Sequence, residues 1–586
     1  MAEDRELVTQ ASRLSIAIGD LIQRRGRMAE LGSENGTPML DWVGAVGRLL
    51  EARSGLETVE AEARALWERG IRHVIWAGMG GSVVAVQVMV AMSCCDGSMP
   101  DTFVIHPLDS TDPAALNRIV ARLARDRNLP LRPDTTVDRA YLEALLSDVL
   151  MVGVAMGMTS EEPITHLQWF VELLDRARLP AAEHALVMAL PESYLDRFAR
   201  DRGIRRLPLQ LDGGHGTGGR MSAPSTRVFL LPAALYLTRH SAERPTAPVG
   251  LREVLGRAWR QYDLAGAAER PLDHPSVRLT LALHAAARHG VCRLLLELPA
   301  SWQPLLPWIE QLMEESLGKG GKGVVVFADQ VLTAVPAHRF DDLVRRVAGE
   351  PAAAEVLAAG SAERLVALCV TLLRWQLSMA LYGYLNDIPF VGQPAVENYK
   401  ARARLLRERD APLESVLESA WAVRSGGLTL LLPEQPAGSS PEPADLLAGV
   451  LVHDGAGYLD LTYNGEPPAS WDALVKTAGE IANRQLGVPL KARRAPAAYH
   501  STEQSEMDGP PYLVSLRVLA LRHEVPMLGR YTDRFLVAQA IATWQAMVEA
   551  GRRCYLLIVD GDGEEAVRLT EQLLQQVERR LVPDLD

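Results

Sequence analysis

Residues 74–82 constrain the fold more than any other part of the chain. They read Val-Ile-Trp-Ala-Gly-Met-Gly-Gly-Ser, an apolar run that enters a glycine-rich turn, and an apolar helix-like stretch follows at 83–92. Glycines let the backbone approach a ligand closely, and the start of a helix offers unpaired N–H groups to an anion. The pattern predicts a strand, a turn and a helix of a parallel α/β sheet, with a turn suited to a phosphate or a phosphorylated sugar. A plain strand-to-helix turn is the competing interpretation of this motif alone.

Strands and helices alternate along most of the sequence after residue 70. In a first unit, expected strands are 72–77, 102–106, 149–155 and 185–190, and expected helices are 83–92, 113–125, 139–147 and 164–178. Later units have expected strands at 291–297, 324–327, 457–462, 512–519 and 553–559, and expected helices at 303–316, 361–384, 470–485 and 533–549. Such alternation predicts doubly wound parallel sheets, which bind ligands beyond the carboxyl ends of their strands.

The predicted organisation has five parts. They are a helical N-terminal segment (1–65), a first α/β domain (66–250), a second α/β domain (251–430), a linker rich in Pro, Glu, Ser and Gly (431–445), and a C-terminal α/β segment (446–586).

Composition narrows the class of protein. The 586 residues carry a net charge of −12 without a long basic block, so nucleic acid is not an expected partner. The five cysteines are scattered, which favours free thiols in a reducing compartment. The N-terminus is polar and charged, and we expect no apolar run of about 18 residues. These features predict a cytoplasmic protein without a membrane partner.

Three charged residues lie beside glycines or at element ends and are candidate site residues. They are Arg220 in a glycine-dense loop, Glu315 before Gly318, and Lys400 after Gln393-Pro394. Taken one at a time, each has an ordinary interpretation: a salt bridge for Arg220, and solvated surface charges for Glu315 and Lys400.

Several short motifs follow one another in a fixed order. They are Gly78-Met79-Gly80-Gly81-Ser82, Leu108-Asp109-Ser110-Thr111-Asp112-Pro113, Gly218-Gly219-Arg220-Met221-Ser222, Glu315-Ser316-Leu317-Gly318-Lys319, Pro389-Phe390 with Gln393-Pro394, Val396-Glu397 and Lys400, and His500-Ser501-Thr502 with Gln504. Together they resemble the phosphoglucose isomerase family, and in particular its bacterial branch that is often fused to transaldolase. The resemblance implies two flavodoxin-like sugar-isomerase (SIS) domains.

The resemblance also implies an activity, the interconversion of glucose 6-phosphate and fructose 6-phosphate through an enediolate. Glu315 would be the base, Arg220 would stabilise the enediolate, and Lys400 would assist ring opening. Substrate would be held by the first glycine turn, the loop after the third expected strand and the C-terminal motif, through Gly80, Gly81, Ser82, Thr159, Ser160 and Gln504. No metal or other cofactor is expected, the partner is a small sugar phosphate, and the resemblance leaves room for a homodimer.

The chain departs from the family pattern at two substrate-handling positions. Met156 stands where the family has a lysine beside its phosphate loop, and Glu161 adds a carboxylate that would repel phosphate. Glu506 replaces a histidine that could serve in ring opening, and it is the residue expected there as a catalytic group. Three hypotheses remain: a working glucose-6-phosphate isomerase, an enzyme for another sugar or sugar phosphate, and a non-catalytic protein that binds a sugar phosphate or a partner.

Overall fold

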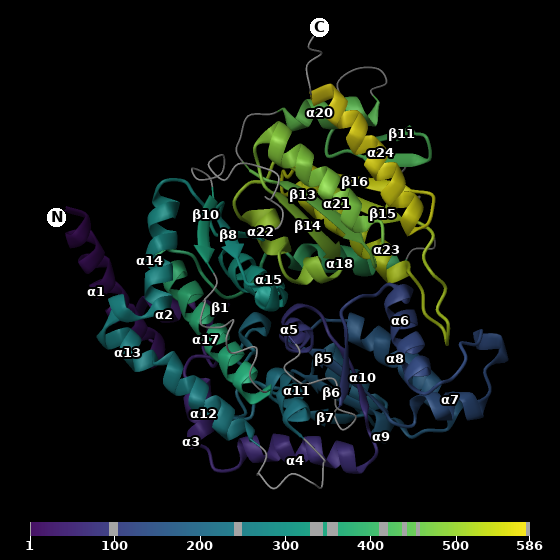
Figure 1. The fold of residues 1–586 in the computed structure, drawn as a ribbon, viewed down its shortest axis with the longest axis horizontal. Coiled ribbons are helices and arrows are strands. Elements are labelled where there is room, and N and C mark those ends of the chain that lie inside the picture. The colour runs from purple at the N-terminus through teal and green to yellow at the C-terminus, as the bar shows by residue number, and fades with distance from the viewer. Residues whose placement is uncertain are drawn as a thin grey trace.

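The computed structural model describes residues 2–92, 103–238, 249–328, 344–348, 361–408, 416, 420–435, 442–452 and 457–581. These residues form a five-stranded, a three-stranded and a six-stranded sheet, together with a two-stranded ribbon. The five-stranded sheet and its helices lie at the bottom of Figure 1, and the six-stranded sheet lies at the top, in green and yellow. The α/β fold class is therefore confirmed.

The first sheet is wholly parallel, with the strand order β4-β3-β5-β6-β7. Its strands are β3 (His73–Ala77), β4 (Val104–Leu108), β5 (Val149–Ala155), β6 (Ala185–Ala189) and β7 (Arg205–Leu207). In chain order this arrangement is 2-1-3-4-5, which is the flavodoxin-like order. Strands β3 and β5 are buried at every residue because helices cover both faces of the sheet.

Helices on the two faces of this sheet complete the first domain. They are α5 (Val84–Ala91), α6 (Pro113–Asp126), α7 (Arg139–Leu146), α8 (Glu162–Ala177), α9 (Ala181–His184), α10 (Tyr194–Asp201) and α11 (Arg227–Leu237), with the 3-10 turns η1 (Gly80–Ser82), η2 (Asp134–Thr136) and η3 (Gly219–Met221). Helix α6 begins where the sequence encodes a cap: the Asp112 carboxylate accepts from Ala114 N at 2.9 Å, and Pro113 has no N–H that would need an acceptor.

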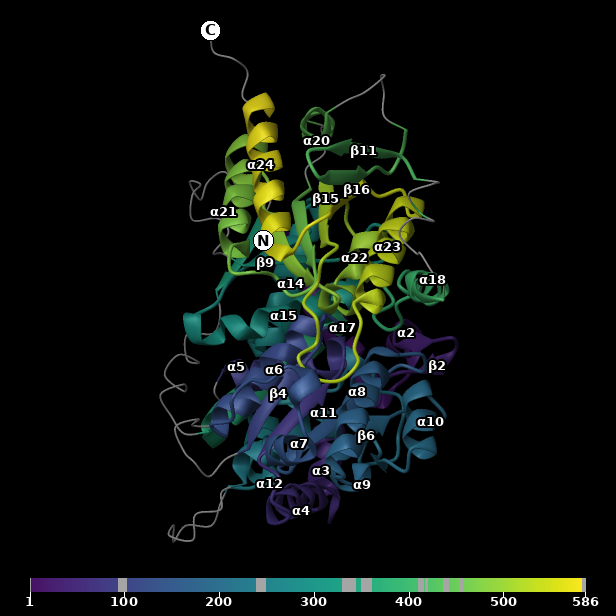
Figure 2. The ribbon, with the colours of Figure 1, turned by 90° about the vertical axis from the view of Figure 1, so that its right-hand side faces the viewer.

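The six-stranded sheet has the order β11-β12-β16-β15-β13-β14, and its four strands β13 to β16 are parallel. Its elements are β11 (Ala422–Ser425), β12 (Leu428–Leu431), α20 (Pro443–Leu451), β13 (Leu459–Asn464), α21 (Trp471–Glu480), η9 (Ile481–Leu486), β14 (Leu490–Ala495), η10 (Ala497–His500), α22 (Glu503–Asp508), β15 (Val514–Ala520), α23 (Arg534–Glu549), β16 (Cys554–Val559) and α24 (Gly563–Leu581). Helices α21 and α24 lie on one face and α23 lies on the other (Figure 2).

The described residues of 249–408 form helices and the three-stranded sheet. They comprise α12 (Leu251–Tyr262), α13 (Leu264–Glu269), η4 (Pro271–Asp273), α14 (Pro275–Arg288), β8 (Arg293–Glu297), η5 (Ala300–Leu305), α15 (Leu306–Glu310), the π-helical turn η6 (Gln311–Glu315), β9 (Val325–Ala328), β10 (Val344–Ala348), α17 (Ser361–Asn386) and α18 (Glu397–Arg407). The helix expected at 303–316 is thus divided into 3-10, α and π turns, and Pro304 lies inside its first part.

One expectation about the second half of the chain, the domain boundary at 430, needs correction. The expected domain 251–430 has its own parallel sheet of only three strands, β10-β8-β9. The hairpin β11–β12 pairs instead with β16, so the expected boundary at 430 cuts through the six-stranded sheet. The second large sheet is therefore built mainly by the C-terminal segment. The expected linker 431–445 lies partly outside the described residues.

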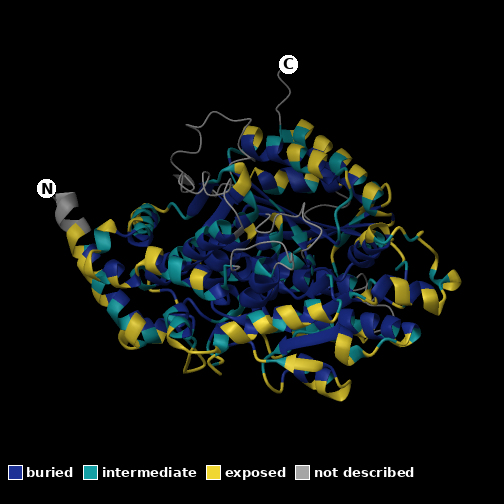
Figure 3. Cartoon of the chain, turned by 60° about the horizontal axis from the view of Figure 1, so that its bottom comes forward, coloured by how far each residue is buried: buried dark blue, intermediate teal, exposed yellow. Residues whose placement is uncertain are grey.

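The N-terminal segment is helical as expected, and it packs into the same core as the first sheet. It comprises α1 (Ala2–Gln23), α2 (Gly26–Leu31), β1 (Ser33–Glu34), β2 (Thr37–Pro38), α3 (Ala45–Glu51) and α4 (Gly55–Glu68). Buried residues fill the interior of the molecule, while exposed ones lie on the outer helix faces (Figure 3). One described helix, residues 362–386, is long and apolar enough to cross a membrane, contrary to the sequence expectation, but 78% of its apolar window is buried in protein.

The loop at 521–533, between β15 and α23, extends from the C-terminal sheet to the helices of the first domain (Figure 2). Leu528 and Tyr531 are part of the hydrophobic core on one face of the first sheet. Trp169 Nε1 donates to the Leu528 carbonyl at 2.7 Å, and Asn117 Oδ1 accepts from Met527 N at 2.7 Å. We call residues 521–533 the strap, because they fasten the two domains together.

Replacing Leu528 with Ala tests the strap. Leu528 is 1% exposed, so we expect the free energy of unfolding of the first domain to fall by about 2–5 kcal/mol. Urea unfolding followed by tryptophan fluorescence measures the change. Val525→Ala, in the same strap but at a residue 81% exposed, is the control that should leave stability unaltered. Equal midpoints for Leu528→Ala and the natural protein would show that the strap adds no stability.

Candidate functional site

Two glycine turns from the first domain pack directly against each other. A Cβ on Gly81 would lie 2.1 Å from the carbonyl carbon of Gly219, so no side chain fits there. Ser222 Oγ donates to the Gly81 carbonyl at 3.2 Å. Gly80 has φ +51° and approaches the His500 carbonyl. The predicted turn thus lies at the carboxyl end of β3, but Gly81 is used for backbone packing, and Ser82 is buried.

The second turn places Arg220 against Glu315, so two of the candidate site residues lie together. Arg220 Nη1 donates to Glu315 Oε1 at 2.8 Å, although the residues are 95 positions apart. Arg220 Nε donates to Ser316 Oγ at 2.6 Å, and both members of the ion pair are buried. The other carboxylate oxygen, Oε2, accepts from Gln311 Nε2 at 2.9 Å. The carboxylate is therefore held in one orientation by two donors.

The Lys319 ammonium and the Arg220 guanidinium donate alternately to the four successive carbonyls of residues 389–392. Lys319 Nζ donates to the carbonyls of Pro389 and Val391 at 2.7 and 3.0 Å, and Arg220 Nη2 donates to those of Phe390 and Gly392 at 3.1 and 3.3 Å. Burial, together with the nearby Arg220 charge, lowers the pKa of Lys319 to about 7. The Phe390 segment is thereby fixed beside the Arg220–Glu315 pair.

A pocket lies beyond the carboxyl end of β5, which is the neighbour of β3 in the sheet, and neither Arg220 nor Glu315 lines it. These two strands flank the point where the strand order of the sheet reverses, which is the usual ligand site of such sheets. The pocket contains the expected residues Thr159, Ser160 and Lys400. Its full lining is Thr159, Ser160, Glu161, Glu162, Tyr399, Lys400, Ala403, Arg404, Arg407, His500, Phe535 and Gln539.

Gln311 connects the pocket with the buried ion pair. Its Nε2 donates both to Glu315 Oε2 and to the His500 carbonyl, each at 2.9 Å. The His500 ring lines the pocket and contacts Glu162 Oε1 through Nε2 at 2.8 Å. One side chain therefore separates the carboxylate of Glu315 from a residue of the pocket wall.

Glu162 is ionised over the whole physiological range. Burial alone would raise its pKa, but the charge of His500 and the hydrogen bond from it outweigh burial and lower the pKa to about 2. Gln539 Nε2 donates to the same carboxylate at 2.8 Å. Because an ionised carboxylate only accepts, His500 Nε2 must be the donor, which leaves Nδ1 for another partner.

Glu506 and Gln504 do not lie in the pocket. Glu506 is 1% exposed and belongs to a buried ion cluster, where Arg517 Nη2 donates to Oε2 at 2.6 Å and Arg493 pairs with Oε1. Gln504 bridges Ala395 N and the Gly318 carbonyl, each at 3.0 Å. The expectation that Glu506 is catalytic is corrected: two arginines on the face of the six-stranded sheet take up its charge.

Glu161 also differs from its expected role. Its carboxylate accepts from Arg404 Nε at 3.2 Å and from Arg407 Nη2 at 2.7 Å, so its charge is neutralised rather than free to repel a phosphate. Met156 is half-buried, and its Cβ lies 3.8 Å from the position of a Cβ on Gly219.

Four residues of the site escaped the sequence analysis as functional groups: Gln311, Lys319, Glu162 and His500. Two signals were present. Gln311 precedes Glu315 by one helical turn, and Lys319 closes the Glu-Ser-Leu-Gly-Lys motif. The His500–Glu162 contact joins residues 338 positions apart and left no local signal.

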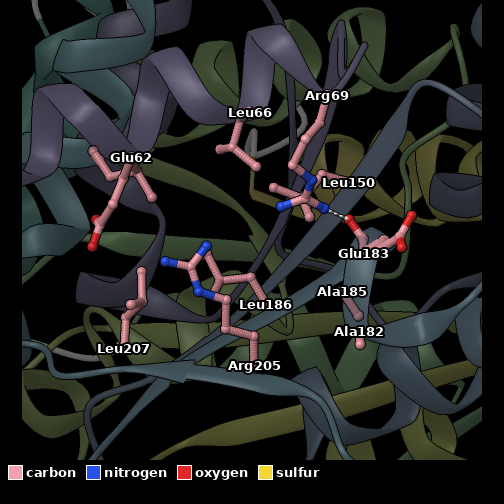
Figure 4. A pocket seen from close by; sticks show the side chains of 11 residues that line it. Glu62, Leu66, Arg69, Leu150, Ala182, Glu183, Ala185, Leu186, Arg205 and Leu207 are labelled. Atoms are coloured by element: carbon pink, nitrogen blue, oxygen red, sulfur yellow. Dashed lines mark hydrogen bonds between the residues drawn. The ribbon is translucent and has the colours of Figure 1, made fainter.

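A second pocket, of about 300 Å³, lies between α4 and the amino ends of β5, β6 and β7 (Figure 4). Arg69 crosses it to the Glu183 carbonyl, and the remaining lining is mostly apolar. It opens at the amino ends of the strands, whereas the glycine turns lie at the carboxyl ends. It brings no set of polar groups together, so it is not a candidate site. Among the described residues, no group of three His, Cys, Asp or Glu side chains is suited to hold a metal.

Fold and site define an α/β protein with two large, mainly parallel sheets and a polar pocket at the strand-order reversal of the first. No family model matches the sequence. The chain is distantly similar to glucose-6-phosphate isomerases. It is 28% identical over 249 residues to the enzyme of Rippkaea orientalis (strain PCC 8801 / RF-1). The identity to the enzyme of Thermosynechococcus vestitus (strain NIES-2133 / IAM M-273 / BP-1) is also 28% over 249 residues. Each match covers 42% of this chain and 40% of the relative, so the chain matches only about two-fifths of these relatives.

Two solved structures are similar over longer stretches. A glucose-6-phosphate isomerase from Chlamydia trachomatis D/UW-3/Cx has a TM-score of 0.49 and 14% identity, covering 70% of this chain and 87% of that one. A hypothetical protein from Thermus thermophilus has a TM-score of 0.40 and 17% identity, covering 98% and 90%. The fold assignment rests on the strand orders above rather than on these values.

Glu506→Gln tests the structural role of the ion cluster. The substitution removes a charge that two buried arginines share, while Asp460 and Glu503 still pair with them, so we expect the free energy of unfolding to fall by about 1–3 kcal/mol. Glu565→Gln, an exposed partner of Arg568, is the control and should leave stability unaltered. Denaturant unfolding measures both. Unaltered stability of Glu506→Gln would mean that the cluster does not need this carboxylate.

The low pKa of Glu162 predicts a pH dependence of stability. A depressed pKa stabilises the fold above the unfolded value of 4.5, and that contribution is lost as the pH falls from 4.5 to about 2. The loss should be on the order of 3 kcal/mol. Thermal unfolding across this range compares the natural protein with Glu162→Gln, which lacks the titrating group and should show a shallower decline. Parallel curves for the two proteins would contradict the assignment.

Proposed function

We propose that this chain is a phosphosugar isomerase that interconverts glucose 6-phosphate and fructose 6-phosphate, with Glu315 as the base. The observation that carries the proposal is the Arg220–Glu315 contact of 2.8 Å, which Gln311 connects through the His500 carbonyl to a pocket lined by Thr159, Ser160 and Lys400. The distant similarity to glucose-6-phosphate isomerases supports it.

The chemistry requires a proton to move between C1 and C2 of an open-chain sugar. The Glu315 carboxylate takes the proton from C2 and returns it to C1, while the hydroxyl proton passes from the oxygen on C2 to the oxygen on C1 and the Arg220 guanidinium stabilises the negative oxygen of the enediolate. Gln311 donates to Glu315 Oε2 and fixes the orientation of the carboxylate. Productive transfer needs the reacting atoms about 3–3.5 Å apart, so the sugar must extend from the pocket past His500 to Glu315.

Ring opening requires a proton donor at the ring oxygen of the cyclic sugar. Lys400 and His500 both line the pocket, and His500 is oriented by Glu162 so that Nδ1 remains for the sugar. We assign this step to Lys400, as the motif predicts, with His500 as the neighbouring acid–base group. Glu506 has no part in it.

A second candidate function is a non-catalytic protein that binds a sugar phosphate. One observation favours it: both oxygens of Glu315 already accept hydrogen bonds, from Arg220 and Gln311, and the residue is buried. A base in this arrangement must break a contact before it can take a proton.

Glu315→Gln separates the two functions. We expect fructose 6-phosphate turnover, measured by coupling to glucose-6-phosphate dehydrogenase, to fall at least about 100-fold, because a positioned general base contributes that much. Glu310→Gln is a matched control one turn earlier, since Glu310 pairs with Lys491 outside the pocket. Unchanged turnover in Glu315→Gln would exclude Glu315 as the base. Absence of turnover in the natural protein, together with binding of 6-phosphogluconate, would favour the non-catalytic function.

A further inference from the structure

Helix α18 presents three cations to the pocket: Lys400, Arg404 and Arg407. Their spacing of four and three residues places them on one face of the helix. The guanidinium of Arg404 lies 5.3 Å from the ring centre of Tyr194, and that of Arg407 lies 4.1 Å from the ring centre of Phe535. Stacking on aromatic rings fixes both arginines in place, so the cations are a built part of the pocket wall.

The carboxylate of Glu161 accepts only some of the hydrogen bonds that these two guanidinium groups can donate. A single oxygen, Oε2, accepts from both Arg404 Nε and Arg407 Nη2. Arg407 Nε is buried and has no hydrogen-bond partner among the described residues. Two guanidinium groups therefore share one negative charge, and a buried donor is left over.

Other acids around the pocket are already engaged. Glu162 accepts from His500 and Gln539, and Glu397 accepts from Lys400 Nζ at 2.8 Å. A phosphate monoester carries nearly two negative charges and three acceptor oxygens at neutral pH. It would satisfy both arginines better than one carboxylate does, since planar guanidinium groups bind phosphate through paired hydrogen bonds.

We propose that Arg404 and Arg407 bind the phosphate of the pocket's ligand and that Glu161 is an internal counter-ion which the phosphate displaces. The inference deepens the proposed function and rests on it, because it identifies what replaces the loop lysine that is absent at Met156. Thr159 and Ser160 lie on the same wall and add hydroxyl donors. The Glu161 side chain is 27% exposed, so its carboxylate can turn into water when it is displaced.

Calorimetric titration with inorganic phosphate and with fructose 6-phosphate tests the proposal without requiring turnover. Glu161→Gln should bind both at least about tenfold more tightly than the natural protein, because the competing charge is gone. Arg404→Gln and Arg407→Gln should each bind both at least about tenfold more weakly. Arg402→Gln is the control on the same helix: Arg402 pairs with Glu549 and does not line the pocket, so affinity should be unchanged.

The outcomes distinguish this inference from the proposed function. Unchanged or weaker binding by a folded Glu161→Gln, or full affinity in Arg404→Gln and Arg407→Gln, overturns it. If Glu161→Gln does not fold, the two arginine variants decide the matter. The expected affinity pattern without isomerase turnover supports the phosphate site and removes only the catalytic proposal. Fructose 6-phosphate binding no tighter than phosphate supports the anion site and shows that the sugar adds no affinity.

Discussion

The geometry of the site depends on the hydrogen bonds that the Arg220 guanidinium donates. The guanidinium reaches the carboxylate of Glu315, the hydroxyl of Ser316 and two carbonyls of the 389–392 segment from a single buried position. A buried cation is tolerated only when its donors are satisfied, so these elements cannot shift independently without leaving a charge unpaired. One side chain of the first domain thus fixes the base, the π-helical turn that carries it, and the neighbouring segment.

Buried charge also organises the six-stranded sheet. Strands β13 to β15 place Asp460, Arg493 and Arg517 on one face, where α22 adds Glu503 and Glu506. Polar residues occupy this face of the sheet because each carboxylate has a guanidinium partner. The arrangement gives a buried polar layer of three carboxylates and two guanidinium groups, in which Glu506 is the carboxylate that both arginines share.

Local patterns in the sequence predicted the helices and strands, and local motifs predicted the candidate site residues. Strand β5 and most helices lie within a few residues of their expected ranges, because apolar periodicity and the cap at Asp112 are encoded nearby. Strand β14 was missed because Lys491 and Arg493 interrupt its apolar pattern. Motifs singled out Arg220 and Glu315 as candidates but not their contact, and the arginine partners of Glu506 and Glu161 lie in other strands and helices, which spacing cannot show.

The strap has a consequence for the order in which the chain acquires its structure. Leu528 completes a hydrophobic core whose strands begin at residue 73, and Asn117 bonds to Val525 across 408 positions. During synthesis, part of the apolar core of the first domain therefore stays uncovered until the strap has left the ribosome. Such long-range closure slows folding and leaves a partly covered core open to aggregation until the strap arrives.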